Sequence, residues 1–381
     1  MTSHRLHPQH IEYRRVVVKV GTNLLTGGSA RLDAEAMAGI IAQIVAIRAL
    51  GAQVVLVSSG AIAAGRQRLG DAGIVADVPM RQALAAVGQS RLMSVWDELF
   101  ELQHIVVAQA LLTRRDLADR LGYLNARNTL LGLLERGVVP IVNENDVVSI
   151  EEIGESVIGD NDNLSAEVAN LVDADLLLIL TDIAGLYTAD PRHDPTATLI
   201  EEVARIDEAI ERASAGQPGE RDIGGMATKV QAARTATAAG IHVIIADGGA
   251  TDAIRRAAAA EPGVGTHFLP TADRVESRRR YLLSRLQARG RIVVDAGAAR
   301  ALEHDGKSLL PAGVVRVEGE FQRGDVVRIV TAEGRDLASG SVNYSSAEIE
   351  QVRGQRSGRI AELLGYEYGE EVVHRNNLVL L

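Results

Sequence analysis

Residues 16–23 read VVVKVGTN and residues 54–61 read VVLVSSGA, and these two stretches decide the fold. Both open with a continuous apolar run, which is typical of a strand buried on both faces of a parallel sheet. Between them, Asp33 precedes apolar residues that recur at spacings of three and four, which predicts a helix with Asp33 as its N-cap. Strand, helix and strand in this order predict a right-handed βαβ unit.

Helical stretches separate further apolar runs, at residues 105–107, 138–142, 176–180 and 241–246. Such an alternation indicates the α/β class, with an open, mostly parallel sheet sandwiched by helices. We place this domain at residues 14–272. The polar residues 1–13 are expected to form a disordered tail.

The chain changes character after this domain. Short apolar runs at residues 292–294, 314–317 and 325–330 are separated by Gly-containing turn signals, which predicts a small β-barrel or sandwich at residues 291–381. Residues 273–290 would be the linker. Residues 274–291 carry seven arginines against one glutamate, and we interpret them as a solvated or inter-subunit connector rather than an anion or nucleic-acid patch.

Composition narrows the class of protein. The 381 residues include no cysteine, which excludes a disulfide scaffold, thiolate metal ligands and a cysteine nucleophile. The formal net charge of −10 argues against nucleic acid or an anionic membrane as the main partner. No apolar run approaches the roughly 20 residues that span a bilayer, and residues 1–15 show no secretory signal. We therefore expect a soluble cytoplasmic enzyme with no membrane contact.

Two candidate anion-binding segments follow the first two strands. Lys19 interrupts a valine-rich strand two residues before Gly21, at the end where open α/β sheets place their ligands. The alternative is an edge-strand lysine that points to solvent. Ser59 and Gly60 precede a helix whose N-terminus favours anions. Ser59 has no nucleophile elbow around it, and a capping serine is an equal alternative.

Later segments add polar groups near other predicted strand ends. The clusters NEND (143–146) and GDNDN (159–163) offer carboxylates and amides, although such residues are also favoured in turns. Thr181 and Asp182 end another strand, and GGMATK (224–229) opens a helix with a glycine pair and a lysine. Neither a Walker A segment nor a Rossmann fingerprint is present in the required context.

Six of these motifs, in this order and spacing, resemble the amino acid kinase family. They are VVVKVGTN, SSGAIAAG, NEND, GDNDNLSA, LTDIAGLYTADP and GGMATK. Within that family the match is to the enzymes that phosphorylate glutamate. The segment from residue 291, with EFQRGDVVRI at its centre, resembles a PUA domain.

The resemblance implies roles for individual residues. Lys19 and Lys229 would contact the transferring phosphoryl group, and Asp162 would hold both lysines. The implied glutamate ligands are Ser59, Gly60, Asp146 and Asn161. The implied ATP-site residues are Lys19, Gly21, Thr181, Asp182, Ile223, Gly224, Gly225, Met226, Ala227, Thr228 and Lys229. The family usually has a small hydroxyl residue or glycine where Ile223 stands, so only a backbone contact is expected there.

The resemblance also implies a reaction. ATP, with Mg²⁺ as cofactor, would phosphorylate the γ-carboxylate of L-glutamate to glutamyl 5-phosphate, the first intermediate toward proline. A carboxylate is already a nucleophile, so positioning and charge neutralisation would suffice. No protein ligand for Mg²⁺ is assigned. Proline is expected to inhibit by competing at the glutamate site, and we expect a homo-oligomer, a dimer or a tetramer.

Two alternatives remain at this point. Aspartokinase, acetylglutamate kinase and uridylate kinases share the ATP half of the family's site and differ on the acceptor side. RNA binding through the second domain is a different class of function. Residues 290–381 hold 11 basic against 14 acidic residues, which is not the basic footprint that RNA binding requires.

Overall fold

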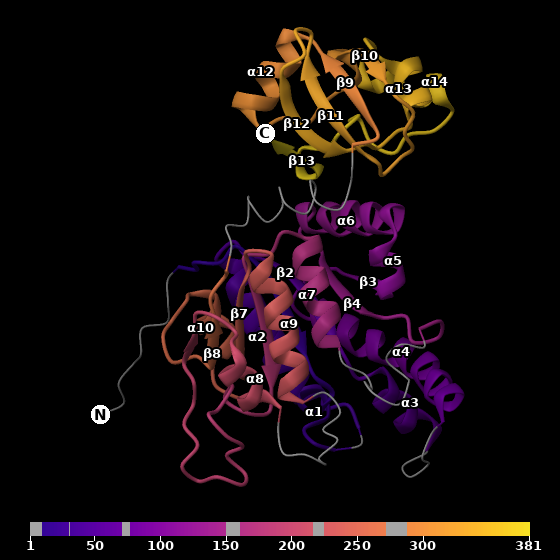
Figure 1. Ribbon diagram of the computed structural model, residues 1–381. Coiled ribbons are helices and arrows are strands. Elements are labelled where there is room, and N and C mark those ends of the chain that lie inside the picture. Colours follow the sequence, from indigo (N-terminus) through magenta and orange to yellow (C-terminus); the bar gives the residue numbers. More distant parts are fainter. Residues whose placement is uncertain (1–9, 30, 71–76, 150–160, 216–224, 272–287) are drawn as a thin grey trace. The chain divides into compact units, whose positions relative to one another are not determined.

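The computed structural model describes residues 10–29, 31–70, 77–149, 161–215, 225–271 and 288–381 (Figure 1). The chain divides into two compact units, Met1–Ala118 with Asn125–Ala272, and Asp119–Leu124 with Asp273–Leu381. No helix among the described residues is long and apolar enough to cross a membrane.

An eight-stranded sheet forms the centre of the first unit, in the order β3-β4-β2-β1-β5-β7-β8-β6. Its strands are β1 (Arg15–Val20), β2 (Gln53–Ser58), β3 (Val107–Leu112), β4 (Val139–Glu144), β5 (Leu176–Thr181), β6 (Glu202–Val203), β7 (His242–Asp247) and β8 (Thr266–Phe268). Neighbouring strands are parallel except β7 and β8. The predicted open, mostly parallel sheet is confirmed.

One predicted strand was misplaced. The run at residues 105–107 does not form a strand of its own, because β3 begins only at Val107. The backbone N–H of Ile105 donates to the carbonyl of Phe100 (3.1 Å), so Ile105 belongs to the turn that ends the preceding helix. Val106 is 67% exposed, which a buried central strand would not allow.

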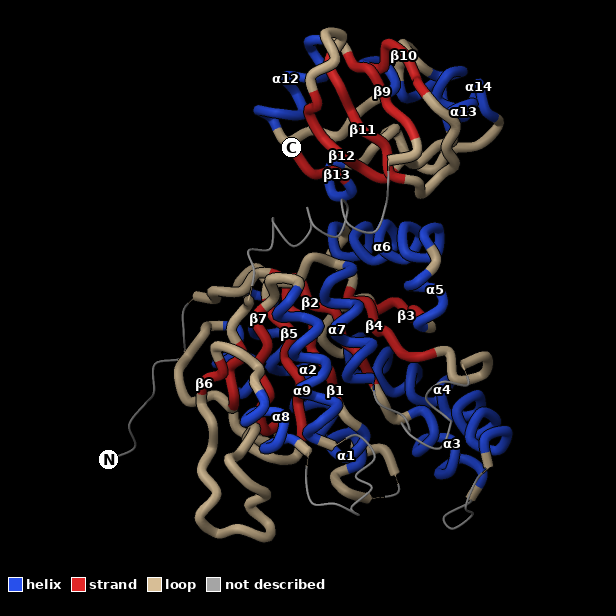
Figure 2. The backbone as a smooth tube through the Cα atoms, in the orientation of Figure 1, coloured by secondary structure: helices blue, strands red, loops and turns tan. Residues whose placement is uncertain are grey.

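Helices cover both faces of this sheet (Figure 2). The helices between residues 22 and 258 are α1 (Thr22–Thr26), α2 (Ala34–Ala49), α3 (Ala61–Leu69), α4 (Val78–Glu101), α5 (Arg114–Ala118), α6 (Arg120–Glu135), α7 (Asn161–Leu171), α8 (Glu208–Ser214), α9 (Met226–Ala238) and α10 (Ala253–Ala258). Val16, Val18 and Val20 of β1 share one buried cluster with residues of α2, α4 and α10. Successive strand residues point to opposite faces, so Lys19 points to the other face, where α7 contacts β1 and packs against α9.

The predicted boundary between tail and domain, at residues 13 and 14, lies too late in the chain. Residues 1–9 lie outside the described part of the chain, but Tyr13 is only 6% exposed. Its ring lies 5.1 Å from the His242 ring, and the backbone N–H groups of Glu12 and Tyr13 both donate to the carbonyl of Ala258. Ile11 packs against the same core. These apolar and backbone contacts place residues 11–13 in the folded unit.

The second unit has a five-stranded sheet in the order β10-β9-β11-β12-β13. Its elements are β9 (Gly290–Val294), α12 (Ala296–Asp305), η1 (Pro311–Gly313), β10 (Val314–Glu318), β11 (Val326–Thr331), β12 (Asp336–Ser341), α13 (Ser346–Val352), η2 (Ser357–Arg359), α14 (Ile360–Leu364), η3 (Arg375–Asn377) and β13 (Leu378–Leu380). Only β9 and β11 pair in parallel. Phe321, Tyr344 and Ile349 anchor a separate buried core. Most of the arginine-rich segment and the predicted linker lies in residues 272–287, outside the described residues.

Candidate active site

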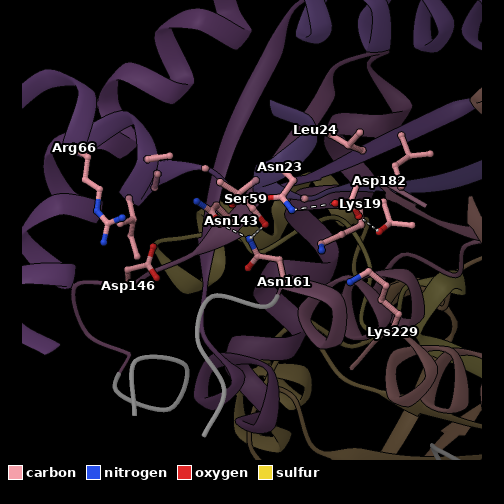
Figure 3. Close-up of a pocket in the computed structure, with 18 of the residues that line it drawn as sticks. Lys19, Asn23, Leu24, Ser59, Arg66, Asn143, Asp146, Asn161, Asp182 and Lys229 are labelled. Carbon is pink, nitrogen blue, oxygen red and sulfur yellow. Dashed lines mark hydrogen bonds between the residues drawn. The ribbon is translucent and has the colours of Figure 1, made fainter. Parts of the chain in front are cut away.

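A pocket of about 320 Å³ opens at the carboxyl end of the central strands (Figure 3). The chain passes from β1 to β2 on one side and later places β5 on the other side of β1. In open α/β sheets such a reversal leaves a crevice outside the strand ends, and ligands bind there. The residues that follow β1, β2, β4 and β5 line this pocket together with Lys229 of α9.

Three helices begin at this edge with a glycine N-cap. Gly21, Gly60 and Gly225 precede α1, α3 and α9, and none of these helices has a side-chain capping hydrogen bond. By contrast, α2 and α4 are capped by the side chains of aspartates. The first-turn N–H groups at the glycine caps therefore keep their capacity to donate to an anion. Gly60 has φ = +104°, a conformation that side-chain-bearing residues rarely adopt.

A fully buried carboxylate holds two lysines at the centre of the site. The Asp162 Oδ1 atom lies 2.5 Å from Lys19 Nζ, and Oδ2 lies 3.1 Å from Lys229 Nζ. The Thr228 hydroxyl donates to the same carboxylate at 3.1 Å. Two ammonium groups and one carboxylate sum to a net positive charge in a buried position, which favours an anionic ligand. Lys19 is 4% exposed on a strand flanked by β2 and β5, so the edge-strand alternative is wrong.

Lysine itself is a rare choice in this chain. Of the 40 residues that are Lys or Arg, only Lys19, Lys229 and Lys307 are lysines. Lysine presents a compact point charge, whereas arginine presents a planar fork with fixed geometry. Two of the three lysines therefore lie in this one pocket.

Hydrogen bonds fix the side-chain amide of Asn161 beside these lysines. Its Nδ2 atom donates to the backbone carbonyl of Ser58 (3.1 Å), to Ser59 Oγ (3.2 Å) and to Asn143 Oδ1 (2.8 Å). Because a backbone carbonyl can only accept, the nitrogen must face Ser58. Asn143 in turn donates to Gln89 Oε1 at 2.7 Å. The carbonyl oxygen of the Asn161 amide is thereby left for a donor on a ligand.

Ser59 has a different role from either local alternative. The N-cap of α3 is Gly60, so Ser59 does not cap that helix. Its hydroxyl oxygen accepts from Asn161 and lines the pocket. This arrangement suits ligand binding, and no nucleophile role is needed to explain the residue.

Asp146 supplies a carboxylate at the far side of Asn161 (Figure 3). Burial and the nearby charge of Glu144 raise the pKa of Asp146 to about 6. A desolvated carboxylate in this position would regain favourable interactions by pairing with an ammonium group. Glu144 itself is buried and accepts a hydrogen bond from Ser149.

Asp182 lies on the opposite side of Asn161 from Asp146 (Figure 3), and Thr181 precedes it at the end of β5. Asp182 accepts hydrogen bonds from Asn23 Nδ2 (3.2 Å) and from the Thr181 hydroxyl (3.1 Å). Burial alone would raise the pKa of Asp182, but the hydrogen bonds from Asn23, its own backbone and Thr181, with the charge of Lys229, hold the pKa below its ordinary value. Asp182 is therefore an anionic acceptor at this end.

The structure brings most of the predicted site residues together. The predicted residues that line the pocket are Lys19, Gly21, Ser59, Gly60, Asp146, Asn161, Thr181, Asp182 and Lys229. Asp162 lies behind the two lysines with no exposed surface. Gly225, Met226, Ala227 and Thr228 form the cap and first turn of α9, which carries Lys229. Ile223 and Gly224 lie outside the described residues.

Sequence reasoning missed other residues of this site. Asn23, Arg66 and Arg81 line the pocket. Gln89 does not line it but accepts a hydrogen bond from Asn143, which does. Asn23 belongs to the quoted VVVKVGTN stretch and could have been proposed from it. The other three lie within amphipathic helices, where nothing in the local pattern separates them from ordinary surface residues.

Comparison with known protein families identifies one family for each of two segments of this chain. Residues 14–247 match the amino acid kinase family, and residues 290–364 match the PUA domain. The chain belongs to the amino acid kinase family.

Among its curated relatives is the glutamate 5-kinase of Dehalococcoides mccartyi strain CBDB1, 53% identical over 97% of this chain and 99% of the relative. The glutamate 5-kinase of Herpetosiphon aurantiacus is 50% identical over 96% of this chain and 98% of the relative. Among solved structures, a UMP kinase from Bacillus anthracis shares 18% identity with a TM-score of 0.46, covering 68% of this chain and 97% of the other. A similarity that low carries no information on the substrate.

Proposed function

We propose that this protein transfers the γ-phosphoryl group of ATP to the γ-carboxylate of L-glutamate, forming L-glutamyl 5-phosphate and ADP. The observation that carries the proposal is the pair of buried lysines held by Asp162 at the carboxyl edge of the sheet. The glutamate 5-kinases that match nearly the whole chain support the choice of substrate.

The polar groups divide between the two substrates. Thr181, Asp182 and the first turn of α9 would contact ATP on one side of the lysines. Ser59, Gly60, Asp146 and Asn161 would bind glutamate on the other side. Figure 3 supports this division, because Asp182 and Asp146 lie on opposite sides of Ser59 and Asn161.

The reaction needs no general base. An oxygen of the γ-carboxylate attacks the γ-phosphorus, the bond from that phosphorus to the β,γ-bridging oxygen breaks, and ADP leaves with the electron pair. Negative charge on the transferring group is stabilised by Lys19 and Lys229, which Asp162 keeps in place before the reaction. The helix N-termini at Gly21 and Gly225 add N–H donors directed at phosphate.

Magnesium would enter this site with the nucleotide. Among the described residues no group of three or more His, Cys, Asp or Glu side chains could hold a metal ion. Asp162 is already engaged by two lysines, whereas Asp182 offers one anionic carboxylate beside the pocket. Such a site fits Mg²⁺, which proteins commonly bind through one or two carboxylates together with substrate phosphates. When bound, Mg²⁺ would neutralise phosphate charge.

A hydroxamate assay tests the proposal directly. Hydroxylamine traps acyl phosphates, so ATP-dependent hydroxamate should form with L-glutamate and not with L-aspartate or N-acetyl-L-glutamate. Aspartate has a shorter side chain than glutamate. N-acetylglutamate has no charged amino group, which is the group that Asp146 and Asn161 would recognise. Equal turnover of aspartate would contradict the assigned substrate.

Proline is the proposed inhibitor at the glutamate side. It carries an α-carboxylate and a charged amine like glutamate, and it lacks the γ-carboxylate that reacts. It would therefore occupy the site without turnover. Glutamate saturation curves at several proline concentrations should show competition, and inhibition that ignores the glutamate concentration would place proline elsewhere.

A further inference from the structure

Two arginines line the pocket at a distance from the lysines. Arg66 lies on α3 and Arg81 on α4, and both are half-buried. Figure 3 shows Arg66 on the same side of Ser59 and Asn161 as Asp146, whereas Lys19, Asp182 and Lys229 lie on the other side. Basic side chains therefore line the pocket at both ends.

Within the described ranges, the two guanidinium groups have no anionic partner. In the part of the chain that the structure describes, neither arginine forms an ion pair or a hydrogen bond. By contrast, the nearby Arg91 pairs with Glu98 on the surface of α4. Burial, together with the charge of Arg66, lowers the pKa of Arg81. Two like charges that face one pocket without a counterion repel each other, and a bound anion would relieve that repulsion.

The two helices that carry the arginines, α3 and α4, pack with their backbones in close approach. A Cβ atom at Gly65 would lie 2.0 Å from the carbonyl oxygen of Leu84, and one at Gly88 would lie 1.8 Å from the carbonyl oxygen of Ala61. The two helix backbones therefore touch. Arg66 directly follows Gly65 on one helix, and Arg81 lies one turn before Leu84 on the other.

We infer that Arg66 and Arg81 bind the α-carboxylate of the amino acid substrate. This inference rests on the function proposed above. Glutamate has two carboxylates, and the γ-carboxylate must reach the lysine end to react. Its α-carboxylate then needs a second cationic region, next to the group that binds the α-ammonium. Arg66 and Arg81 beside Asp146 provide that combination, and a guanidinium fork matches a carboxylate in two-point geometry.

The first test uses the unaltered protein and changes the ligand. The α-amide of L-glutamate (L-isoglutamine) keeps the ammonium group and the γ-carboxylate but replaces the α-carboxylate with a neutral amide. Loss of charge-assisted hydrogen bonds should raise KM by about 10-fold to 100-fold, with a smaller change in kcat. Equal KM values for glutamate and its α-amide would overturn the inference.

The second test changes the arginines. Arg66→Gln and Arg81→Gln should each raise KM for glutamate about 10-fold or more, leave KM for ATP within about 2-fold, and reduce the discrimination against the α-amide. Arg68→Gln is the matched control, because Arg68 is exposed on the same helix and does not line the pocket. That control should retain the discrimination of the unaltered protein.

These experiments distinguish a failure of the proposed function from a failure of the arginine assignment. If the unaltered protein forms no hydroxamate with glutamate, the proposed function fails. If it is active and the Gln variants discriminate as the unaltered protein does, only the arginine assignment fails. Arg66→Lys and Arg81→Lys keep the charge in case a Gln variant does not fold, and they should show an intermediate KM because a single ammonium cannot bind the carboxylate bidentately.

Discussion

A single buried carboxylate, Asp162, organises the centre of the site. It has no exposed surface, and its two oxygens approach the ammonium groups of different elements, Lys19 of β1 and Lys229 of α9. Removing one partner of such a buried group leaves an uncompensated charge, which costs far more than losing an exposed ion pair. The positive charge that we propose acts on the phosphoryl group is therefore held in place by the fold.

Replacing Lys229 tests that preorganisation. Lys229→Ala should lower kcat by about 10²-fold to 10³-fold, the range for removing one preorganised electrostatic group from a transition state. Lys307→Ala is the matched control, since Lys307 is the remaining lysine and is exposed in the second unit. Steady-state kinetics with saturating ATP and glutamate measure both variants. A Lys229→Ala protein with near-normal kcat would reduce the lysine to a structural role.

The pH dependence of glutamate phosphorylation tests the proposed role of Asp146 in substrate binding. Its pKa lies at about 6 because of burial and Glu144, above the ordinary value of 3.8. The ionised form needed to bind an ammonium group is therefore lost as the pH falls through about 6, not near 4. We expect kcat/KM for glutamate to fall below about pH 6, since this quantity reports the free enzyme. The pH profile of the Asp146→Asn variant should lack this fall in kcat/KM. If the fall persists in the variant, a group other than Asp146 causes it.

At the scale of elements, the strands were largely predictable and the helix faces were not. Continuous apolar runs identify β1, β2 and β5 because both faces of these strands are buried. The same local pattern placed Lys19, Ser59 and Thr181 at strand ends, where ligands bind. Arg66 and Arg81 could not be found in that way. Their position in the pocket depends on how α3 packs against α4, which a sequence read locally does not specify.

The glycine contact between α3 and α4 gives a prediction at this scale. Gly88→Ala would place a Cβ atom 1.8 Å from the Ala61 carbonyl oxygen, so the helices must separate. Despite the better helix propensity of alanine, we expect a loss of about 1–3 kcal/mol in the free energy of unfolding. The displaced arginines should also raise KM for glutamate.

Gly39→Ala is the matched control for this prediction. Gly39 lies within α2, is exposed, and has no atom within 4 Å of an added Cβ. Alanine there should increase stability by up to about 1 kcal/mol. Urea unfolding monitored by circular dichroism compares the two variants. A Gly88→Ala protein as stable as Gly39→Ala would mean that the two helices are not in backbone contact.

At the scale of the whole molecule, each of the two units has a buried core of its own. The core cluster around β1 and Trp96 includes no residue beyond Val264, and the cluster around Phe321 and Tyr344 begins at Ile292. Every residue that lines the pocket lies between Lys19 and Lys229. The short, turn-rich strands after residue 290 predicted the second unit, but nothing in their pattern predicted what it does.

Removing the second unit tests whether the site is complete without it. A chain ending at residue 272 keeps the whole described pocket and the core beneath it, so it should fold and retain kcat and both KM values within about 3-fold. A chain of residues 288–381 should unfold cooperatively on its own, because Phe321, Tyr344 and Ile349 supply it with a buried core. Circular dichroism reports folding of both fragments, and ADP release reports activity of the first. A folded but inactive fragment would show that the second unit contributes to the chemistry, and an unfolded one would show that the units depend on each other for stability.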